Sequence, residues 1–367
     1  MLDLGYGLIA FVASFFTALV IVKTQKFHGF LTQDGLAGVQ KIHSTATPRI
    51  GGIALLLGVI VAGFFLTSEA QKLWWTICLC AVPAFGSGFI EDLTKKVGAK
   101  WRLLATVLAG LIFCLVTGYN LERADIPGLD FLLTYPAFGI ALTAFTIGGV
   151  ANSLNIIDGV NGLASGSAII ILSGFAVLAG ESGDEAMLAI CLIMIGAIAG
   201  FFVLNFPTGK IFFGDAGAYA TGFVLAVIGI ILPLRNPEFS PLIALLALSY
   251  PIIETMVSIY RRTRREGTHP GEADRLHLHS LVYRYRAKRL ADLLGRPNLR
   301  NALTAVVLWS LTLVATTFMV LGAHSPFVLL LGGAFVFWLY TILYRRVALL
   351  SQLRKAWRQR HRILPGE

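Results

Sequence analysis

The chain has 367 residues, of which 56% are hydrophobic and 14% are charged, with a net charge of +10 and a mean hydropathy of +0.75. Soluble domains carry about 25% charged residues, so this composition excludes an ordinary soluble protein. The apolar residues come in blocks rather than in alternation, which disfavours a transmembrane barrel and predicts membrane-spanning helices. The four cysteines all lie in these apolar blocks and offer neither a disulfide framework nor a zinc-binding spacing.

Hydropathy and Gly/Pro punctuation predict an all-α, polytopic integral membrane protein with about eleven transmembrane helices. They are expected near residues 4–22, 50–66, 73–90, 102–118, 132–151, 163–180, 186–204, 219–233, 240–260, 302–321 and 326–344. The first segment is too long for a signal-peptide core and has no positive residue before it, so it is expected to stay as a helix with its N-terminus outside.

The basic residues give this topology a direction. With the N-terminus outside, all but three of the 30 lysines and arginines fall on the inner side; the exceptions are Lys72, Arg123 and Arg235. By the positive-inside rule the C-terminus is then inside as well. The net positive charge is therefore interpreted as a topology signal, helped by attraction to anionic membrane lipids, and not as a nucleic-acid-binding surface.

The predicted organisation is one transmembrane catalytic domain, residues 1–344, followed by a basic cytoplasmic tail, residues 345–367. The cytoplasmic loops of this domain are expected at 23–49, 91–101, 152–162, 205–218 and 261–301. Polar residues with catalytic potential recur in these loops, at the inner end of one span after another. A membrane scaffold would not need them, whereas an active site assembled from loops would.

The first inner loop carries Lys41, His43 and Arg49, followed by Gly51 and Gly52. The three polar side chains are suited to binding a phosphate, and the glycine pair permits a close backbone approach. The alternative is a plain basic loop that flanks the membrane.

The second inner loop begins with adjacent carboxylates, Glu91 and Asp92, and continues with Lys95 and Lys100. Neighbouring carboxylates at a membrane boundary are costly unless they meet a cation or solvent. The alternative is a simple ion pair on the helix surface.

The strongest local motif contains Asn152, Asn155, Asp158 and Asn161. A spacing of three residues places the first three on one side of a helix, where amides and a carboxylate can hold a sugar or uracil. Asp158 could also reach a metal. Helix capping and interhelical hydrogen bonds are the structural alternative.

A related segment carries Lys210 and then Asp215 in a Gly-Asp-Ala-Gly sequence. Glycines let the chain turn tightly and present the carboxylate, a hard oxygen ligand that suits Mg²⁺. An ordinary Gly-Asp turn is the alternative.

The last long inner loop contains an arginine cluster that includes Arg264, and then His277 and His279. Histidines two apart could ligate zinc, but no cysteine partner lies nearby. Among arginines they are better interpreted as donors to a pyrophosphate.

Taken in order from about Lys41 to His279, these motifs resemble those of the polyprenyl-phosphate N-acetylhexosamine-1-phosphate transferases, a glycosyltransferase family 4 group that includes the phospho-MurNAc-pentapeptide transferase. The resemblance implies transfer of a sugar 1-phosphate from a UDP-N-acetylhexosamine to undecaprenyl phosphate, with release of UMP, at the cytoplasmic face of a bacterial inner membrane. It implies Mg²⁺, with Mn²⁺ as an alternative, as the cofactor. Membrane lipids are expected as partners, and a homodimer is left open.

The resemblance also assigns roles. Asp215 is expected at the metal, and Asp158 at the metal or the nucleotide sugar. Asp92, with Glu91 beside it, is expected at the lipid phosphate, and these two and Asp158 are the expected catalytic residues. Substrate binding is expected from the remaining site residues: Lys41, His43, Arg49, Lys95, Lys100, Asn152, Asn155, Asn161, Lys210, Arg264, His277 and His279.

Four positions distinguish this chain within the family pattern. Glu91 and Asn161 stand where relatives usually carry Asp, and His-Leu-His at residue 277 replaces a triple histidine, which favours the O-antigen-initiating type over the MurNAc-pentapeptide enzyme. Asp158 favours a bacterial enzyme.

A transporter or lipid flippase, the alternative from another class, would place polar residues near the membrane midplane, whereas these spans are apolar in their middles and show no internal repeat.

Overall fold

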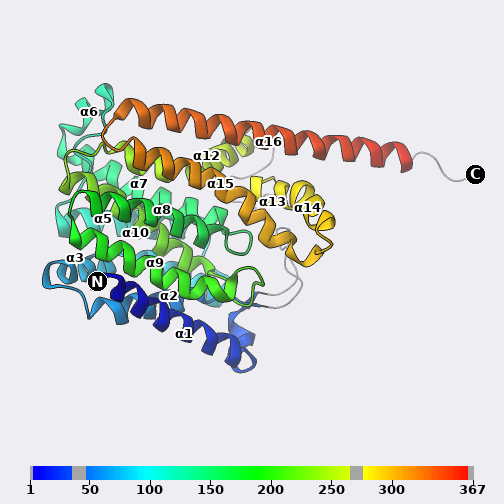
Figure 1. Cartoon of the computed structure of the whole chain (residues 1–367), viewed down its shortest axis with the longest axis horizontal. Helices are drawn as coiled ribbons and strands as arrows, with labels where there is room; N and C mark the ends of the chain where they lie inside the picture. The colour runs from blue at the N-terminus through cyan, green and yellow to red at the C-terminus, as the bar shows by residue number, and fades with distance from the viewer. Residues whose placement is uncertain (1–2, 35–46, 265–275, 363–367) are drawn as a thin grey trace, which may run out of the picture.

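The structure is a computed structural model that describes residues 3–34, 47–264 and 276–362. In these ranges long helices lie side by side and form one bundle (Figure 1). The helices and strands are α1 (Asp3–Thr32), β1 (Gln33–Asp34), β2 (Thr47–Pro48), α2 (Gly51–Gly63), α3 (Ser68–Cys80), α4 (Val82–Thr94), α5 (Ala99–Thr117), α6 (Pro127–Leu133), α7 (Pro136–Ile157), α8 (Leu163–Glu181), α9 (Glu185–Asn205), α10 (Gly214–Arg235), α11 (Leu242–Ala247), α12 (Ser249–Thr263), α13 (Leu278–Val282), the π-helix η1 (Tyr283–Ala287), α14 (Lys288–Leu293), the 3₁₀-helix η2 (Pro297–Leu299), α15 (Arg300–Leu321) and α16 (Pro326–Arg362).

The prediction of an all-α, polytopic membrane protein is confirmed. Eight helices in the described ranges are long and apolar enough to cross a membrane, and the bent pair α3 and α4 brings the number to nine. Of the other predicted spans, α2 is a shorter apolar helix, and the segment near 240–260 is divided between α11 and α12. The number of eleven spans and their orientation stay predictions.

Two predicted spans are interrupted close to a proline. Helices α3 and α4 meet at an angle of 47°, and Pro83 lies in the first turn of α4. The break between α11 and α12 falls at Leu248, just before Pro251. Because proline has no N–H to donate to the preceding turn, a helix is readily bent or ended there.

Three helices continue beyond their predicted ends. Helix α1 runs to Thr32 rather than to residue 22, α7 to Ile157 rather than 151, and α16 to Arg362 rather than 344. Hydropathy marks only the part of a helix that fits the hydrocarbon, whereas backbone hydrogen bonds can continue past it. After α1 the chain forms a short antiparallel pair in which Gln33 lies opposite Pro48.

Helix α10 is the centre of the bundle. It contacts α2, α4, α7 and α8, and in its most apolar window 89% of the residues are buried. At Gly222 a side chain would place its Cβ only 2.6 Å from the Cα of Ala151, so α10 and α7 are in direct backbone contact. The residues at the start of α10 are therefore surrounded by the ends of several helices.

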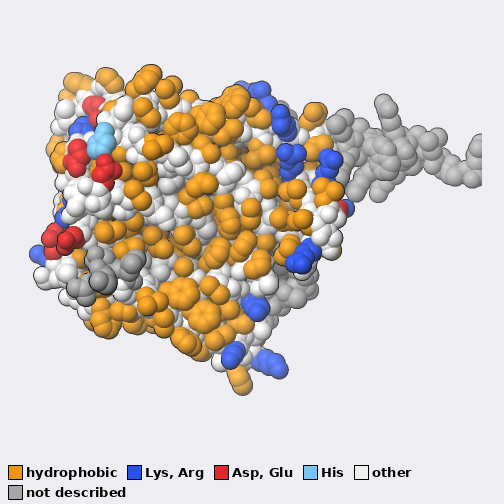
Figure 2. Space-filling view, viewed as in Figure 1, with side chains coloured by type: hydrophobic (Ala, Val, Ile, Leu, Met, Phe, Trp, Pro, Cys, Tyr) orange, Lys and Arg blue, Asp and Glu red, His pale blue; other side chains and the backbone are white. Residues whose placement is uncertain are grey.

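The outside of the bundle is apolar. Large hydrophobic side chains are widely exposed, among them Leu8 at 63%, Phe145 at 64% and Leu313 at 56%. Figure 2 shows hydrophobic side chains over most of the visible face, with Lys and Arg along the edge from which α16 projects. Such a surface fits contact with lipid, as the hydropathy predicts.

Candidate active site

Asp92 at the end of α4 caps the first turn of α10. Its Oδ1 accepts a hydrogen bond from the backbone N–H of Asp215 at 2.8 Å, and its Oδ2 accepts from the N–H of Ala216 at 3.0 Å. An acidic side chain at this position satisfies two otherwise unpaired amides and complements the positive end of the helix dipole. Because both amides donate to Asp92, which is itself fully buried, they are already occupied and are not offered to a substrate phosphate.

Glycines allow this close contact. A Cβ at Gly88 would lie 2.5 Å from the backbone nitrogen of Ala216, so only glycine lets α4 come this near to α10. Gly214 has a φ of +77°, and a Cβ there would lie 2.2 Å from the carbonyl oxygen of Arg49. The predicted close approach at Gly52 is confirmed: its N–H donates to the carbonyl of Phe213 at 2.9 Å.

Asp215 is the point where the polar side chains meet. Its Oδ1 accepts from Arg49 Nη2 at 2.6 Å and from Asn155 Nδ2 at 3.0 Å, and its Oδ2 pairs with Arg102 Nη1. Arg49 also reaches Asp92, with Nε 3.3 Å from Oδ1. The carboxylates of Asp215 and Asp92 thus share a buried site with the guanidinium groups of two arginines.

Arg102 and Tyr219 are site residues that the sequence did not mark. Arg102 stands at the start of α5 in a run of basic residues, where its charge satisfies the positive-inside rule equally well. Tyr219 lies one turn after Asp215, and its hydroxyl is 3.5 Å from Asn155 Oδ1. The only sequence signal for Tyr219 is its position one helical turn beyond a predicted metal ligand.

The amide and carboxylate motif at the end of α7 is divided in the structure. Asn155 faces Asp215, whereas Asn152 donates to Thr106 Oγ1 and to the carbonyl of Gly148, both at 2.8 Å. Asn152 thus makes the interhelical contact that the structural alternative predicted. Asp158 follows the last helical residue of α7 and is partly buried. Loss of hydration raises the pKa of Asp158 to about 7. The charge of Arg49 opposes this rise, and that of Asp215 adds to it.

Other predicted residues connect loops around the site. Glu91 Oε2 accepts from the N–H of Val97 at 2.7 Å and so closes the turn after α4. The N–H of Asn161 donates to Asn301 Oδ1 at 2.6 Å, and its side chain donates to the carbonyl of Pro207 at 3.2 Å. These contacts give Glu91 and Asn161 structural partners within the fold.

The predicted lysines lie at the surface near this end of the bundle. Lys95, Lys100 and Lys210 are exposed, and Arg264 is exposed with its guanidinium over the ring of Tyr260 at 4.6 Å. Lys41 and His43 lie outside the described residues.

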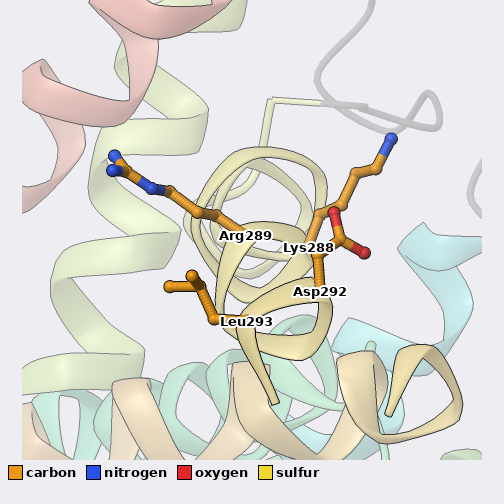
Figure 3. A pocket seen from close by; sticks show the side chains of 4 residues that line it. All are labelled: Lys288, Arg289, Asp292 and Leu293. Atoms are coloured by element: carbon orange, nitrogen blue, oxygen red, sulfur yellow. The ribbon is translucent and has the colours of Figure 1, made fainter. Parts of the chain in front are cut away.

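A separate surface depression is lined by four residues of α14, and no predicted site residue lines it (Figure 3): Lys288, Arg289, Asp292 and Leu293.

The histidine motif packs against the end of α7. His277 and His279 are buried, with their rings parallel and 5.4 Å apart. A Cβ at Gly159 would lie 2.3 Å from His279 Nε2, so the glycine after Asp158 makes room for this ring. Residues more than 100 positions apart in the chain are therefore brought to one end of the bundle.

The chemistry of these side chains fits a magnesium ion. Asp215 and Asp158 supply hard carboxylate oxygens, and Asp215 already binds cationic groups through both of its oxygens. Within the described ranges no three His, Cys, Asp or Glu side chains are arranged to hold a metal by themselves. Mg²⁺ commonly takes one or two protein carboxylates and completes its shell with phosphate and water, so this donor set is sufficient.

Comparison with known proteins gives the family. The model of glycosyl transferase family 4 matches residues 74–233. A phospho-N-acetylmuramoyl-pentapeptide-transferase of Bacillus cytotoxicus is 30% identical over 220 residues, which cover 56% of this chain and 67% of that protein. The chain belongs to glycosyl transferase family 4.

Two further relatives carry a different name. A "Probable undecaprenyl-phosphate N-acetylglucosaminyl 1-phosphate transferase" of Bacillus subtilis is 28% identical over 274 residues, covering 74% of this chain and 75% of that protein. An undecaprenyl-phosphate alpha-N-acetylglucosaminyl 1-phosphate transferase of Yersinia pestis is 27% identical over 250 residues, covering 67% and 68%. In this family 4 chain, Asp92, Asn155, Asp158 and Asp215 fall within the matched range, whereas the histidine motif lies beyond it.

Proposed function

We propose that this chain transfers a sugar 1-phosphate from a UDP-N-acetylhexosamine to undecaprenyl phosphate, giving undecaprenyl-pyrophosphoryl-sugar and UMP. The observation that carries the proposal is the convergence of Arg49, Arg102 and Asn155 on Asp215 at one end of the bundle. The names of the Bacillus subtilis and Yersinia pestis relatives supply the substrate class.

In the proposed reaction an oxygen of the lipid phosphate attacks the β-phosphorus of the UDP-sugar. The bond between this phosphorus and the bridging oxygen breaks, and UMP leaves with that oxygen. A phosphate monoester is largely ionised near neutral pH, so the nucleophile needs positioning more than deprotonation. Both reactants are anionic, and catalysis of this kind consists mainly of alignment and charge stabilisation.

The side chains divide this work. Asp215 and Asp158 would hold Mg²⁺, which when bound neutralises charge on the diphosphate. Arg49 and Arg102 bind phosphate oxygens, and Asn155 orients the donor. Asp92, through the two amides that it caps, keeps Asp215 in place.

The remaining predicted residues act around this centre. Substrate phosphates are bound by the buried histidine pair and by exposed basic residues: His277, His279, Lys95, Lys100, Lys210 and Arg264. The predicted orientation puts this end of the bundle at the cytoplasmic face of a bacterial inner membrane, where a soluble nucleotide sugar can meet a lipid. The product would start a surface polysaccharide such as an O-antigen.

The proposal is tested with protein purified in detergent, undecaprenyl phosphate, Mg²⁺ and a panel of UDP-sugars, with UMP release and the mass of the lipid product as readouts. UDP-GlcNAc is expected to support UMP release, and chelation of Mg²⁺ to stop it. Absence of UMP with every donor would contradict the proposal and return attention to a transporter or flippase.

A second candidate, phospho-MurNAc-pentapeptide transfer, is favoured by the name of the Bacillus cytotoxicus relative. The same panel includes UDP-MurNAc-pentapeptide. A lipid product formed from that donor alone would replace the simple UDP-N-acetylhexosamine as the donor while leaving the reaction class unchanged.

A further inference from the structure

A buried carboxylate outside the proposed reaction centre is bonded to the histidine motif. Glu254 of α12 is completely buried. Its Oε1 accepts from His277 Nδ1 and from the N–H of Leu278, each at 3.0 Å, and its Oε2 accepts from the hydroxyl of Tyr340 at 2.9 Å. An isolated buried charge would be strongly destabilising, and here three donors compensate it.

These bonds define the state of the histidine ring. An ionised carboxylate can only accept, so His277 donates through Nδ1. The partner of one ring nitrogen fixes both the tautomer and the ring orientation and leaves the other nitrogen for function. Nε2 of His277 consequently faces the guanidinium group of Arg262, 3.4 Å from its Nη2.

The third donor comes from the last helix. Tyr340 is 2% exposed and lies on α16, which packs against both α12 and α13. One turn later the hydroxyl of Tyr344 accepts from Arg261 Nη1 at 2.9 Å and lies 3.5 Å from the carbonyl of Leu276. Helix α16 therefore contacts both α12 and the segment that carries the histidines.

A continuous set of contacts then leads to the proposed site. Tyr340 bonds Glu254, Glu254 bonds His277, and the ring of His277 is stacked on that of His279. His279 in turn occupies the space left by Gly159, the residue after Asp158. Neither Glu254 nor Tyr340 lies within residues 74–233, the range of the family match.

We propose that Glu254 and Tyr340 are positioning residues, which act through His277 to hold the histidine pair in the active site, and that α16 is thereby part of the catalytic framework. This inference rests on the proposed function for its activity readout. A purely structural role for Glu254, as a tie between α12 and α16, is the alternative to be excluded.

A double-mutant cycle separates the two roles. Glu254→Gln keeps the side-chain volume and is expected to lower kcat/KM for UMP release roughly 10- to 100-fold, the usual cost of losing a residue that orients a functional histidine. In a His277→Gln background the same change is expected to cost less than about threefold, because its target is already gone. Effects that multiply independently would overturn the proposal.

Tyr340→Phe removes one donor and leaves the bond to His277, so a loss smaller than that of Glu254→Gln is expected. Matched controls are Thr255→Val on α12 and Thr341→Val on α16, whose hydroxyls donate only within their own helices, to Pro251 and Phe337. Both controls should stay within about twofold of wild type.

A spectroscopic readout is independent of turnover. In ¹⁵N-histidine-labelled protein, the His277 signals, identified by their loss in His277→Gln, are expected to show a proton on Nδ1 with the downfield shift of a charge-assisted hydrogen bond. Glu254→Gln should move this proton upfield, and Tyr340→Phe should move it less. Unchanged signals, or the absence of a proton on Nδ1 in the wild type, would refute the positioning role. Failure of the wild type to release UMP would instead refute the proposed function.

Discussion

The two ends of α10 carry the same residue types in very different arrangements. At its end, Arg235 donates to Asp184 through Nε at 2.6 Å and Nη2 at 3.1 Å, and Asp184 also accepts from the N–H of Met187 and so caps α9. At its start, Asp215 receives two arginines while Asp92 and Asp158 lie nearby. An ion pair alone therefore does not mark a functional site. A functional site is indicated instead where several helices contribute more charged side chains than the fold needs.

The largest expected effect is the loss of Asp215. Asp215→Asn removes the charge on which the two arginines converge and which would hold the metal, and we expect UMP release to fall by roughly 10²- to 10³-fold or more. Asp184→Asn at the other end is the matched control and should retain turnover. The measurement is UMP release by protein that is monodisperse in detergent. Wild-type turnover in Asp215→Asn would remove this residue from the site.

A substitution of Arg102 tests whether its unpredicted contact with Asp215 contributes to catalysis. Arg102→Gln is expected to lower kcat/KM roughly 10- to 100-fold, since it removes a charged hydrogen bond of about 1.5–3 kcal/mol, by the general scale of such bonds. Arg235→Gln removes an arginine from the opposite end and should affect thermal stability more than kcat/KM. The two variants behaving alike would mean that Arg102 only anchors α5.

The two amides of α7 give a smaller and sharper contrast. Asn155 bonds Asp215, whereas Asn152, one turn earlier, bonds Thr106 and Gly148. Asn155→Ala should therefore raise KM for the nucleotide sugar or lower kcat. Asn152→Ala should cost about 1 kcal/mol of stability and change turnover less than about threefold. Steady-state kinetics and thermal unfolding of both variants decide between these outcomes, and equal kinetic losses would contradict the division.

Much of this arrangement was readable from the chain. Blocks of apolar residues predict the helices because each block must be as long as the hydrocarbon is thick. The acidic pair, the Asn and Asp spacing and Gly-Asp-Ala-Gly identify the loops, and the structure brings Asp92, Asn155 and Asp215 into one hydrogen-bonded cluster.

The features that the sequence did not reveal depend on which way a side chain faces and on contacts between residues far apart in the chain. Periodicity places Asn152 and Asn155 on the same side of a helix, but only packing against α5 decides which of them faces the site. Arg102 satisfies a topology rule and a site contact with the same charge, so charge counting cannot separate them. Glu254 and Tyr340 are 86 positions apart, and no local pattern links a carboxylate in one helix to a hydroxyl in the last.

The smallest expected effect concerns pH and the opposite end of α10. Burial of Asp184 opposes its ionisation, but the hydrogen bonds from Arg235 and Met187 outweigh burial and lower its pKa below the usual value. A lowered pKa means that the pairing stabilises the fold at pH values above the unfolded-state pKa of about 3.9 and that this contribution is lost as the pH falls through the folded-state value. Asp184→Asn should thus reduce the thermal midpoint at pH 7, by an amount that corresponds to about 1–3 kcal/mol, and the gap to wild type should close as the pH approaches that lower value. Thermal unfolding in detergent across this pH range measures the gap. A gap that persisted in acid would show that Asp184 contributes through the shape of the α9 cap rather than through its charge, and the two ends of α10 would then differ in mechanism as well as in arrangement.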